Sequence, residues 1–184
     1  QVTNPAVSVY SPTSLRVTWN SVPGRSRYEV ERSSTGAENS FYVIKTVSGT
    51  YYKDLNLTCG STWYYRIRAY RISGGVKSYG AYSAIVHGTP AVQQVTNFKA
   101  ATYNTTKIKL TWTRLTGVTG YEISRSDSSS GDYEVIKNTT SRYFYDSDLT
   151  PGTTYYYRIR AFYLNNYGDY STASASTRAA ALGR

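Results

Sequence analysis

The chain has 184 residues, of which 40% are hydrophobic and 15% aromatic, with 21 tyrosines and a formal net charge of +10. Such an aromatic content excludes a disordered tail, because the chain has ample apolar surface to bury. The length suits two small domains better than one large domain. Because β-branched and aromatic side chains fit a pleated, half-buried surface, the abundance of Tyr, Thr and Val indicates an all-β protein.

The positive charge is spread along the chain rather than held in a basic arm. Residues 1–92 carry ten lysines and arginines against four acidic residues, and residues 93–184 carry eleven against seven. This charge favours polyanions such as nucleic acid, acidic polysaccharide or cell-wall polymer, and it serves solubility equally well. No stretch approaches the roughly 20 apolar residues that span a bilayer, so we expect no membrane insertion.

The sequence contains an internal repeat. Gln-Val-Thr-Asn at 1–4 recurs at 94–97, and Tyr-Tyr-Arg-Ile-Arg-Ala at 64–69 recurs at 156–161. Because the repetition covers nearly the whole chain, we predict two copies of one domain. The predicted boundaries are residues 1–90 for the first repeat, 91–178 for the second, and 179–184 for a tail or linker.

Within each copy, apolar residues recur at every second position. Leu15, Val17 and Trp19 alternate with polar residues in the first copy, as do Tyr28 and Val30 further along. This period predicts strands with one buried and one solvated face, because successive side chains in a strand point to opposite sides. Turn-forming clusters separate the runs, and about seven such strands in roughly 90 residues predict two tandem seven-stranded antiparallel β-sandwiches.

The second copy carries a family motif that begins at Asp146 and continues through Leu149, Pro151-Gly152-Thr153 and Tyr155. This pattern resembles fibronectin type III domains, which have an immunoglobulin-like fold. Its tyrosine-rich character is similar to repeats in surface and secreted proteins of clostridia-like Gram-positive bacteria. The resemblance implies a tyrosine corner made by Leu149 and Tyr155, in which the phenol bonds a backbone group.

The first copy departs from this motif. Cys59 stands in place of the proline, and Trp63 stands in place of the corner tyrosine. An indole N–H can donate a hydrogen bond but cannot accept one, so we expect an altered corner there. The predicted core residues of the two copies are Trp19, Tyr28, Leu57, Trp63, Trp112, Tyr121, Leu149 and Tyr155.

Residues with the chemistry of an enzyme site are scarce. His87 is the one histidine and has no counterpart in the second copy, and Cys59 has no base nearby in the sequence and cannot form an intrachain disulfide. Glu29, Glu31 and Glu122 are expected on the solvated face of the third strand, where they would pair with arginines of the sixth strand. We therefore predict no enzyme, and no catalytic, metal or cofactor site.

One surface suggests a ligand. Aromatic rings and arginines alternate along the outer face of the sixth strand, and a stripe of both could bind an acidic glycan or cell-wall polymer. The same residues also serve as strand formers that cover the sheet. Single-stranded nucleic acid is disfavoured because no nucleic-acid-binding motif accompanies the stripe. The candidate residues are Tyr64, Arg66, Arg68, Tyr70, Tyr156, Arg158, Arg160 and Phe162.

The family resemblance implies a non-catalytic spacer or adhesion segment of a larger extracellular bacterial protein, secreted or at the cell surface. Such a segment positions neighbouring domains of the same polypeptide on polysaccharide or at the cell surface, and we expect a monomer. Two alternatives stay open: a module that binds glycan or wall polymer through the Tyr/Arg face, and a receptor ectodomain that binds protein through the loop at 71–78.

Overall fold

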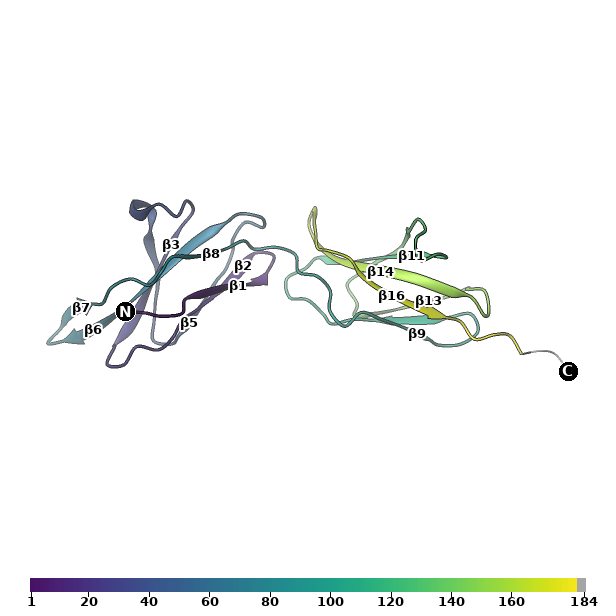
Figure 1. Cartoon of the computed structure of the whole chain (residues 1–184), viewed down its shortest axis with the longest axis horizontal. Coiled ribbons are helices and arrows are strands. Elements are labelled where there is room, and N and C mark those ends of the chain that lie inside the picture. The colour runs from purple at the N-terminus through teal and green to yellow at the C-terminus, as the bar shows by residue number, and fades with distance from the viewer. Residues whose placement is uncertain (182–184) are drawn as a thin grey trace. The chain divides into compact units, whose positions relative to one another are not determined.

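The computed structural model of the chain describes residues 1–181, and it is built from strands with one short 3-10 turn at Glu38–Ser40. The chain divides into two compact units, Gln1–Ala91 and a second unit that begins at Val92. Within each unit, two layers of strands face one another (Figure 1). No helix among residues 1–181 has the length and apolarity needed to cross a membrane.

The first unit is an antiparallel sandwich of a three-stranded and a five-stranded sheet. The smaller sheet has the order β1 (Ala6–Ser11), β2 (Ser14–Thr18), β5 (Tyr51–Asp54). The larger sheet has the order β4 (Tyr42–Val47), β3 (Arg27–Ser33), β6 (Trp63–Ser73), β7 (Val76–Tyr79), and β8 (Val86–Gly88) also pairs with β6.

The second unit repeats this topology strand for strand. Its smaller sheet has the order β13 (Tyr143–Asp146), β10 (Ile108–Thr111), β9 (Lys99–Thr102). Its larger sheet has the order β12 (Glu134–Thr139), β11 (Gly120–Ser126), β14 (Thr154–Tyr163), β15 (Asn166–Tyr167), and β16 (Ser171–Ser176) pairs with β14 as well.

Each unit thus has eight strand segments in the described chain, whereas seven strands were predicted. The difference arises because the last strand is broken in two where it runs along β6 or β14. In the first unit, Gly80 N–H still donates to the Ala69 carbonyl and Ser83 N–H to the Ile67 carbonyl, but the ladder is irregular between them. Gly168 N–H donates to the Ala161 carbonyl at the matching break.

The core of each unit lies between its two sheets and follows the alternation seen in the sequence. Tyr28, Val30 and Ile67 are fully buried, and their counterparts occupy the second core. Burying one large apolar side chain contributes about 1.5–3 kcal/mol, so each unit has a core of its own to stabilise it. Of the eight predicted core residues, Trp63 differs from the rest: it is only partly buried and packs against the edge of the first core.

The tyrosine corner is present in the second unit and altered in the first. Thr150 N–H donates a 3.0 Å hydrogen bond to the phenol oxygen of Tyr155, beside the buried Leu149. In the first unit the buried indole nitrogen of Trp63 has no hydrogen-bond partner, and the ring instead lies under the Arg32 guanidinium at 4.4 Å. An indole cannot accept the backbone N–H that a phenol accepts, which explains the difference.

Candidate ligand-binding face

The predicted stripe lies on the outer face of the larger sheet of each unit, where the register sets acidic residues opposite arginines. In the first unit Glu29 pairs with Arg68 and Glu31 with Arg66 across β3 and β6. Directly opposed residues of opposite charge stabilise a sheet, typically by about 0.2–1 kcal/mol per pair. The predicted pairing of the third and sixth strands is therefore seen in the first unit.

In the first unit the two arginines are layered between aromatic rings. The Arg66 guanidinium lies 4.6 Å from the Phe41 ring centre and 4.0 Å from that of Tyr82. Arg68 lies 4.8 Å from the Tyr82 ring and 3.9 Å from the Tyr79 ring. The result is a continuous stack, aromatic–Arg–Tyr–Arg–Tyr, held by cation–π attraction. We call this arrangement the arginine–tyrosine stack.

Both arginines of this stack form ion pairs with glutamates. Arg66 donates from Nε to Glu31 at 2.7 Å and from Nη1 to Glu38, and Arg68 Nη2 donates to Glu29 at 2.8 Å. Glu29 and Glu31 are 5% and 4% exposed, so the expectation that they lie on a solvated face was wrong: the stack covers them. Burial alone would raise the pKa of Glu29, but its hydrogen bonds, led by that from Arg68, lower the pKa and keep the carboxylate charged.

The second unit builds the same stack from equivalent positions. Arg158 lies 4.7 Å from the Tyr133 ring centre and 4.2 Å from that of Tyr170. Arg160 lies 4.7 Å from the Tyr170 ring and 4.0 Å from the Tyr167 ring. The stack is therefore a property of the repeat and not of one copy.

The two stacks differ in how the arginines are paired. Arg160 Nε donates to Glu122 at 2.8 Å, as Arg68 does to its own glutamate. Arg158, in contrast, faces Ser124 across β11 and β14 and forms no ion pair among the described residues. Both Arg158 Nε and Ser124 Oγ are buried without a hydrogen-bond partner. The second stack thus holds a cation without a counter-charge.

The aromatic members of the predicted face lie in different environments. Tyr64 is half-buried beside His87, with ring centres 5.5 Å apart, and Phe162 is half-buried against Tyr167. Tyr70 is only 4% exposed because Tyr79 packs over it, so it differs from the expectation of a ring open to a ligand.

Tyr156 lines an open hollow on the second unit. This hollow has a volume of about 260 Å³, and its lining includes Tyr133, Thr172 and Ser174. Thr172 and Ser174 are the β16 residues opposite Arg158 and Tyr156 in the strand register. The hollow therefore lies next to the unpaired arginine, and hydroxyl groups and two aromatic rings surround it.

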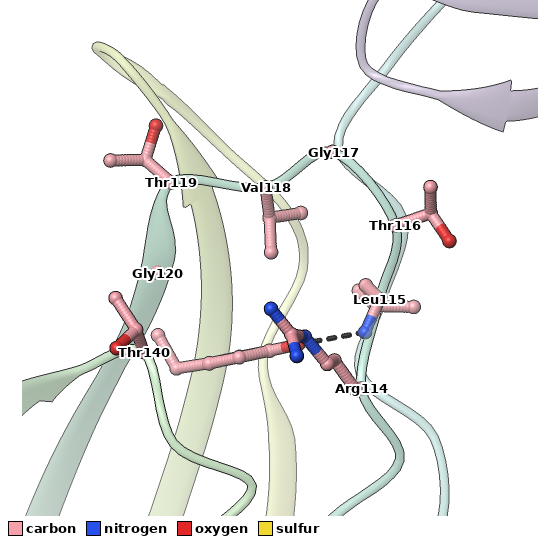
Figure 2. A pocket seen from close by; sticks show the side chains of 9 residues that line it. Arg114, Leu115, Thr116, Gly117, Val118, Thr119, Gly120 and Thr140 are labelled. Carbon is pink, nitrogen blue, oxygen red and sulfur yellow. Dashed lines mark hydrogen bonds between the residues drawn. The ribbon is translucent and has the colours of Figure 1, made fainter.

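A second hollow of about 420 Å³ lies at the loop that joins β10 and β11. Figure 2 shows Arg114 and Val118 directed into the space between this loop and Thr140, while Thr116 and Thr119 point away. The backbone N–H of Leu115 donates to the Tyr121 phenol at its base, at 2.7 Å. The lining residues include no carboxylate or histidine, and the Tyr121 phenol accepts the Leu115 hydrogen bond.

His87 and Cys59, which were expected to be chemically inert, each have an ordinary environment. His87 is exposed on β8 beside Tyr64, and Cys59 is a half-buried free thiol. Residues 1–181 contain no group of three or more His, Cys, Asp or Glu side chains suited to a metal ion. The buried Asp54 and Asp146 each accept hydrogen bonds from an arginine and a tyrosine, so both carboxylates are engaged in bonds within the fold.

One aromatic group was missed by reasoning from the sequence. On the outer face of the smaller sheet of the second unit, Tyr145 makes edge-to-face contacts with Tyr103 and Tyr143, at 5.1 and 6.0 Å between ring centres. Tyr103 and Tyr143 are each about half exposed. The Tyr-Phe-Tyr alternation at 143–145 indicated one aromatic face, but only the strand pairing brings Tyr103 beside it.

Residues 93–177 match the family model described as the fibronectin type III domain. Residues 93–177 are a fibronectin type III domain. The first unit repeats the sequence motifs and strand order of this domain, so the chain holds fibronectin type III repeats in tandem. A two-domain fibronectin type III segment from chicken tenascin has the same fold: it is 18% identical with a TM-score of 0.50, and the match covers 96% of this chain and 99% of that one.

Two bacterial enzymes contain segments similar to the tandem. Exoglucanase B of Cellulomonas fimi is 29% identical over 191 residues, which cover 94% of this chain. Amylopullulanase of Thermoanaerobacterium saccharolyticum is 38% identical over 85 residues, which cover 46% of this chain. The matched segments make up 16% and 6% of those enzymes, so the fibronectin type III tandem corresponds to a small part of each.

Proposed function

We propose that this tandem is a non-catalytic accessory segment of a longer, secreted bacterial protein that acts on polysaccharide. The observation that carries the proposal is the match to exoglucanase B, which covers 94% of this chain but only 16% of that enzyme. The matched segment is a minor part of exoglucanase B, and in our proposal other domains of this protein likewise contribute the chemistry. Its role is to hold neighbouring domains at a suitable separation on the substrate or at the cell surface.

The carboxylates of the chain support a non-catalytic role. A glycoside hydrolase needs two carboxyl groups free to flank a glycosidic bond. Glu29, Glu31 and Glu122 are buried under the arginine–tyrosine stacks, and Asp54 and Asp146 are held inside the sandwiches by arginines. These five acids are therefore paired inside the fold and are not free to flank a glycosidic bond.

The spacer role is tested by exchanging the segment inside a parent enzyme. The tandem is placed between a catalytic domain and a polysaccharide-binding domain and compared with a Gly/Ser linker of equal length, which behaves as a flexible coil. We expect the tandem to give higher activity on insoluble polysaccharide and equal activity on a soluble substrate. Equal activity of the two proteins on both substrates contradicts a positioning role.

A second candidate function is glycan binding by the larger-sheet face. The observation that favours it is the half-buried Tyr156, which lines a hollow rich in hydroxyl groups beside the stack. The test is retention of the purified tandem on insoluble polysaccharides and bacterial cell walls at low and high salt. Retention at high salt that is lost in the double variant Tyr64→Ala/Tyr156→Ala supports this function, with Tyr103→Ala/Tyr143→Ala on the opposite sheet as the matched control.

Two results of the retention experiment contradict glycan recognition. Retention at low salt alone points to the +10 net charge, because salt screens interactions between exposed charges. Absence of retention at either salt concentration leaves the accessory spacer as the function.

A further inference from the structure

We infer that Arg158 and the adjoining hollow form a binding site for a sugar carboxylate, so that the second repeat recognises a uronic-acid residue of an acidic polysaccharide. This inference rests on the glycan-binding function proposed above and names its ligand class. It starts from the difference in how the two arginine–tyrosine stacks pair their arginines with carboxylates.

The first repeat supplies its own carboxylates to the equivalent arginine. Glu31 lies opposite Arg66 in the strand register and bonds its Nε, and Glu38 bonds the same guanidinium from the 3-10 turn. The second repeat has Ser124 at the position of Glu31. It has Ser130 three residues before Tyr133, where the first repeat has Glu38 three residues before Phe41. Both internal carboxylates are therefore replaced by serine.

The geometry around Arg158 is nonetheless kept. Its guanidinium lies between Tyr133 and Tyr170, just as that of Arg66 lies between Phe41 and Tyr82. Arg158 Nε and Ser124 Oγ are buried with no partner within the described chain. In the first repeat the exposed Glu38 bonds Arg66 from the solvent side, and a ligand carboxylate would take the corresponding place on Arg158. Two flanking rings fix the plane of the guanidinium, and a guanidinium with a fixed plane can bind a carboxylate through two parallel hydrogen bonds.

The neighbouring hollow suits a sugar ring. Tyr133 contacts the guanidinium and also lines the hollow, so the two features are continuous. Tyr156 provides a second ring, and Thr172, Ser174 and Ser129 provide hydroxyl groups around a volume of about 260 Å³. A planar cation at one side, aromatic rings and hydroxyl groups match a pyranose that carries a carboxylate. Asp132, beside Tyr133 in the sequence, is exposed and forms no ion pair with Arg158.

The test is a titration of the whole chain with a galacturonic-acid trisaccharide, followed by amide chemical shifts or calorimetry. The fully methyl-esterified trisaccharide, which keeps the rings but has no charge, is the matched ligand control. We expect binding of the acid, at least tenfold weaker binding of the ester, and shifts of residues around Arg158.

Two variants remove the site in different ways. Arg158→Gln removes the cation, and Ser124→Glu installs the carboxylate that the first repeat supplies at Glu31. Both should weaken binding of the acid at least tenfold. Lys99→Gln, which removes an equal charge from an exposed position on β9, should leave binding unchanged. Ser124 is fully buried, so thermal unfolding and the amide spectrum of Ser124→Glu must first match those of the original chain, which separates a loss of binding from a loss of folding.

Several results overturn the inference. Equal binding of acid and ester, or unchanged binding in Arg158→Gln, rejects carboxylate recognition while leaving general glycan binding in place. An equal effect of Lys99→Gln reduces the site to non-specific charge. Absence of binding to the acid rejects the site outright, and binding of a glutamate-rich peptide in its place assigns the arginine to a protein partner. The spacer function is decided separately, by the linker exchange.

Discussion

Tyr157 and Asp146 are joined by a buried hydrogen bond of 2.8 Å between the phenol oxygen and Oδ2, and this bond connects the two sheets of the second repeat. Asp146 ends β13 of the smaller sheet, and Tyr157 lies on β14 of the larger sheet. Arg125 Nη1 donates to the same carboxylate at 3.0 and 3.1 Å. Tyr65, Asp54 and Arg32 form the same cluster in the first repeat, so each sandwich is closed around a charged group.

Asp146→Asn should destabilise the second repeat. The substitution removes the charge that pairs with Arg125 and accepts from Tyr157, and hydrogen bonds to charged groups contribute about 1.5–3 kcal/mol. We expect the free energy of unfolding to fall by about 2 kcal/mol in urea titrations followed by fluorescence. Asp132→Asn, at an exposed position, is the control, and an equal loss in both variants would contradict a role for the cluster.

The stability of both repeats should decrease above about pH 10. Burial, reinforced by the hydrogen bonds to Asp54 and Asp146, raises the pKa of Tyr65 and Tyr157 above the ordinary tyrosine value of about 10. At a pH between the tyrosine pKa of the unfolded chain and the higher pKa of the folded chain, the unfolded chain has lost the phenol proton and the folded chain keeps it. The contribution is therefore complete below pH 10 and declines by about 1.4 kcal/mol per pH unit for each tyrosine as the pH rises further.

Thermal unfolding between pH 8 and pH 11 checks this dependence. The Tyr65→Phe/Tyr157→Phe variant should start from lower stability and lose less of it over the same alkaline range, because neither phenylalanine titrates. The same alkaline decrease in both proteins would assign the effect to other titrating groups, such as the lysines.

Tyr155→Phe should destabilise the second repeat by about 1–2 kcal/mol, because the Thr150 N–H loses its acceptor while the packing of the ring is kept. Urea unfolding measures the change, and Tyr103→Phe, at a half-exposed ring on the other sheet, should have almost no effect. A cost for Tyr155→Phe no larger than that for Tyr103→Phe would show that the corner hydrogen bond contributes nothing to stability.

Each repeat should fold by itself. The units Gln1–Ala91 and the one that begins at Val92 have separate cores and separate sheets. We expect the fragments 1–91 and 92–184 each to give a cooperative thermal transition, measured by circular dichroism. The unfolding curve of the whole chain should equal the sum of the two fragment curves. A fragment that lacks a cooperative transition would show that its sandwich depends on the other repeat.

The sequence was sufficient to predict the repeat, the all-β class and the faces of the main strands. Strands bury every second side chain, so Leu15, Val17 and Trp19 identify a core face without any coordinates. Once the neighbouring strands were known from the family, the same reasoning predicted that glutamates of the third strand pair with arginines of the sixth, and the strand register assigns Glu29 to Arg68. The family motif also located the corner at Tyr155 and its alteration at Trp63.

The sequence alone did not determine which side chains converge from separate strands and loops. Tyr133 and Tyr170 reach Arg158 from opposite sides, although they are separated from it by 25 and 12 residues. The replacement of Glu31 by Ser124 is visible in the repeat, but its consequence is not, because it depends on every group within hydrogen-bond distance of the guanidinium. Strand alternation is a local property of the backbone, whereas the burial and pairing of a charge depend on the whole tertiary environment. The sequence therefore determined the framework of the two sandwiches, and only the tertiary structure decided which arginine of the two arginine–tyrosine stacks lacks a paired carboxylate.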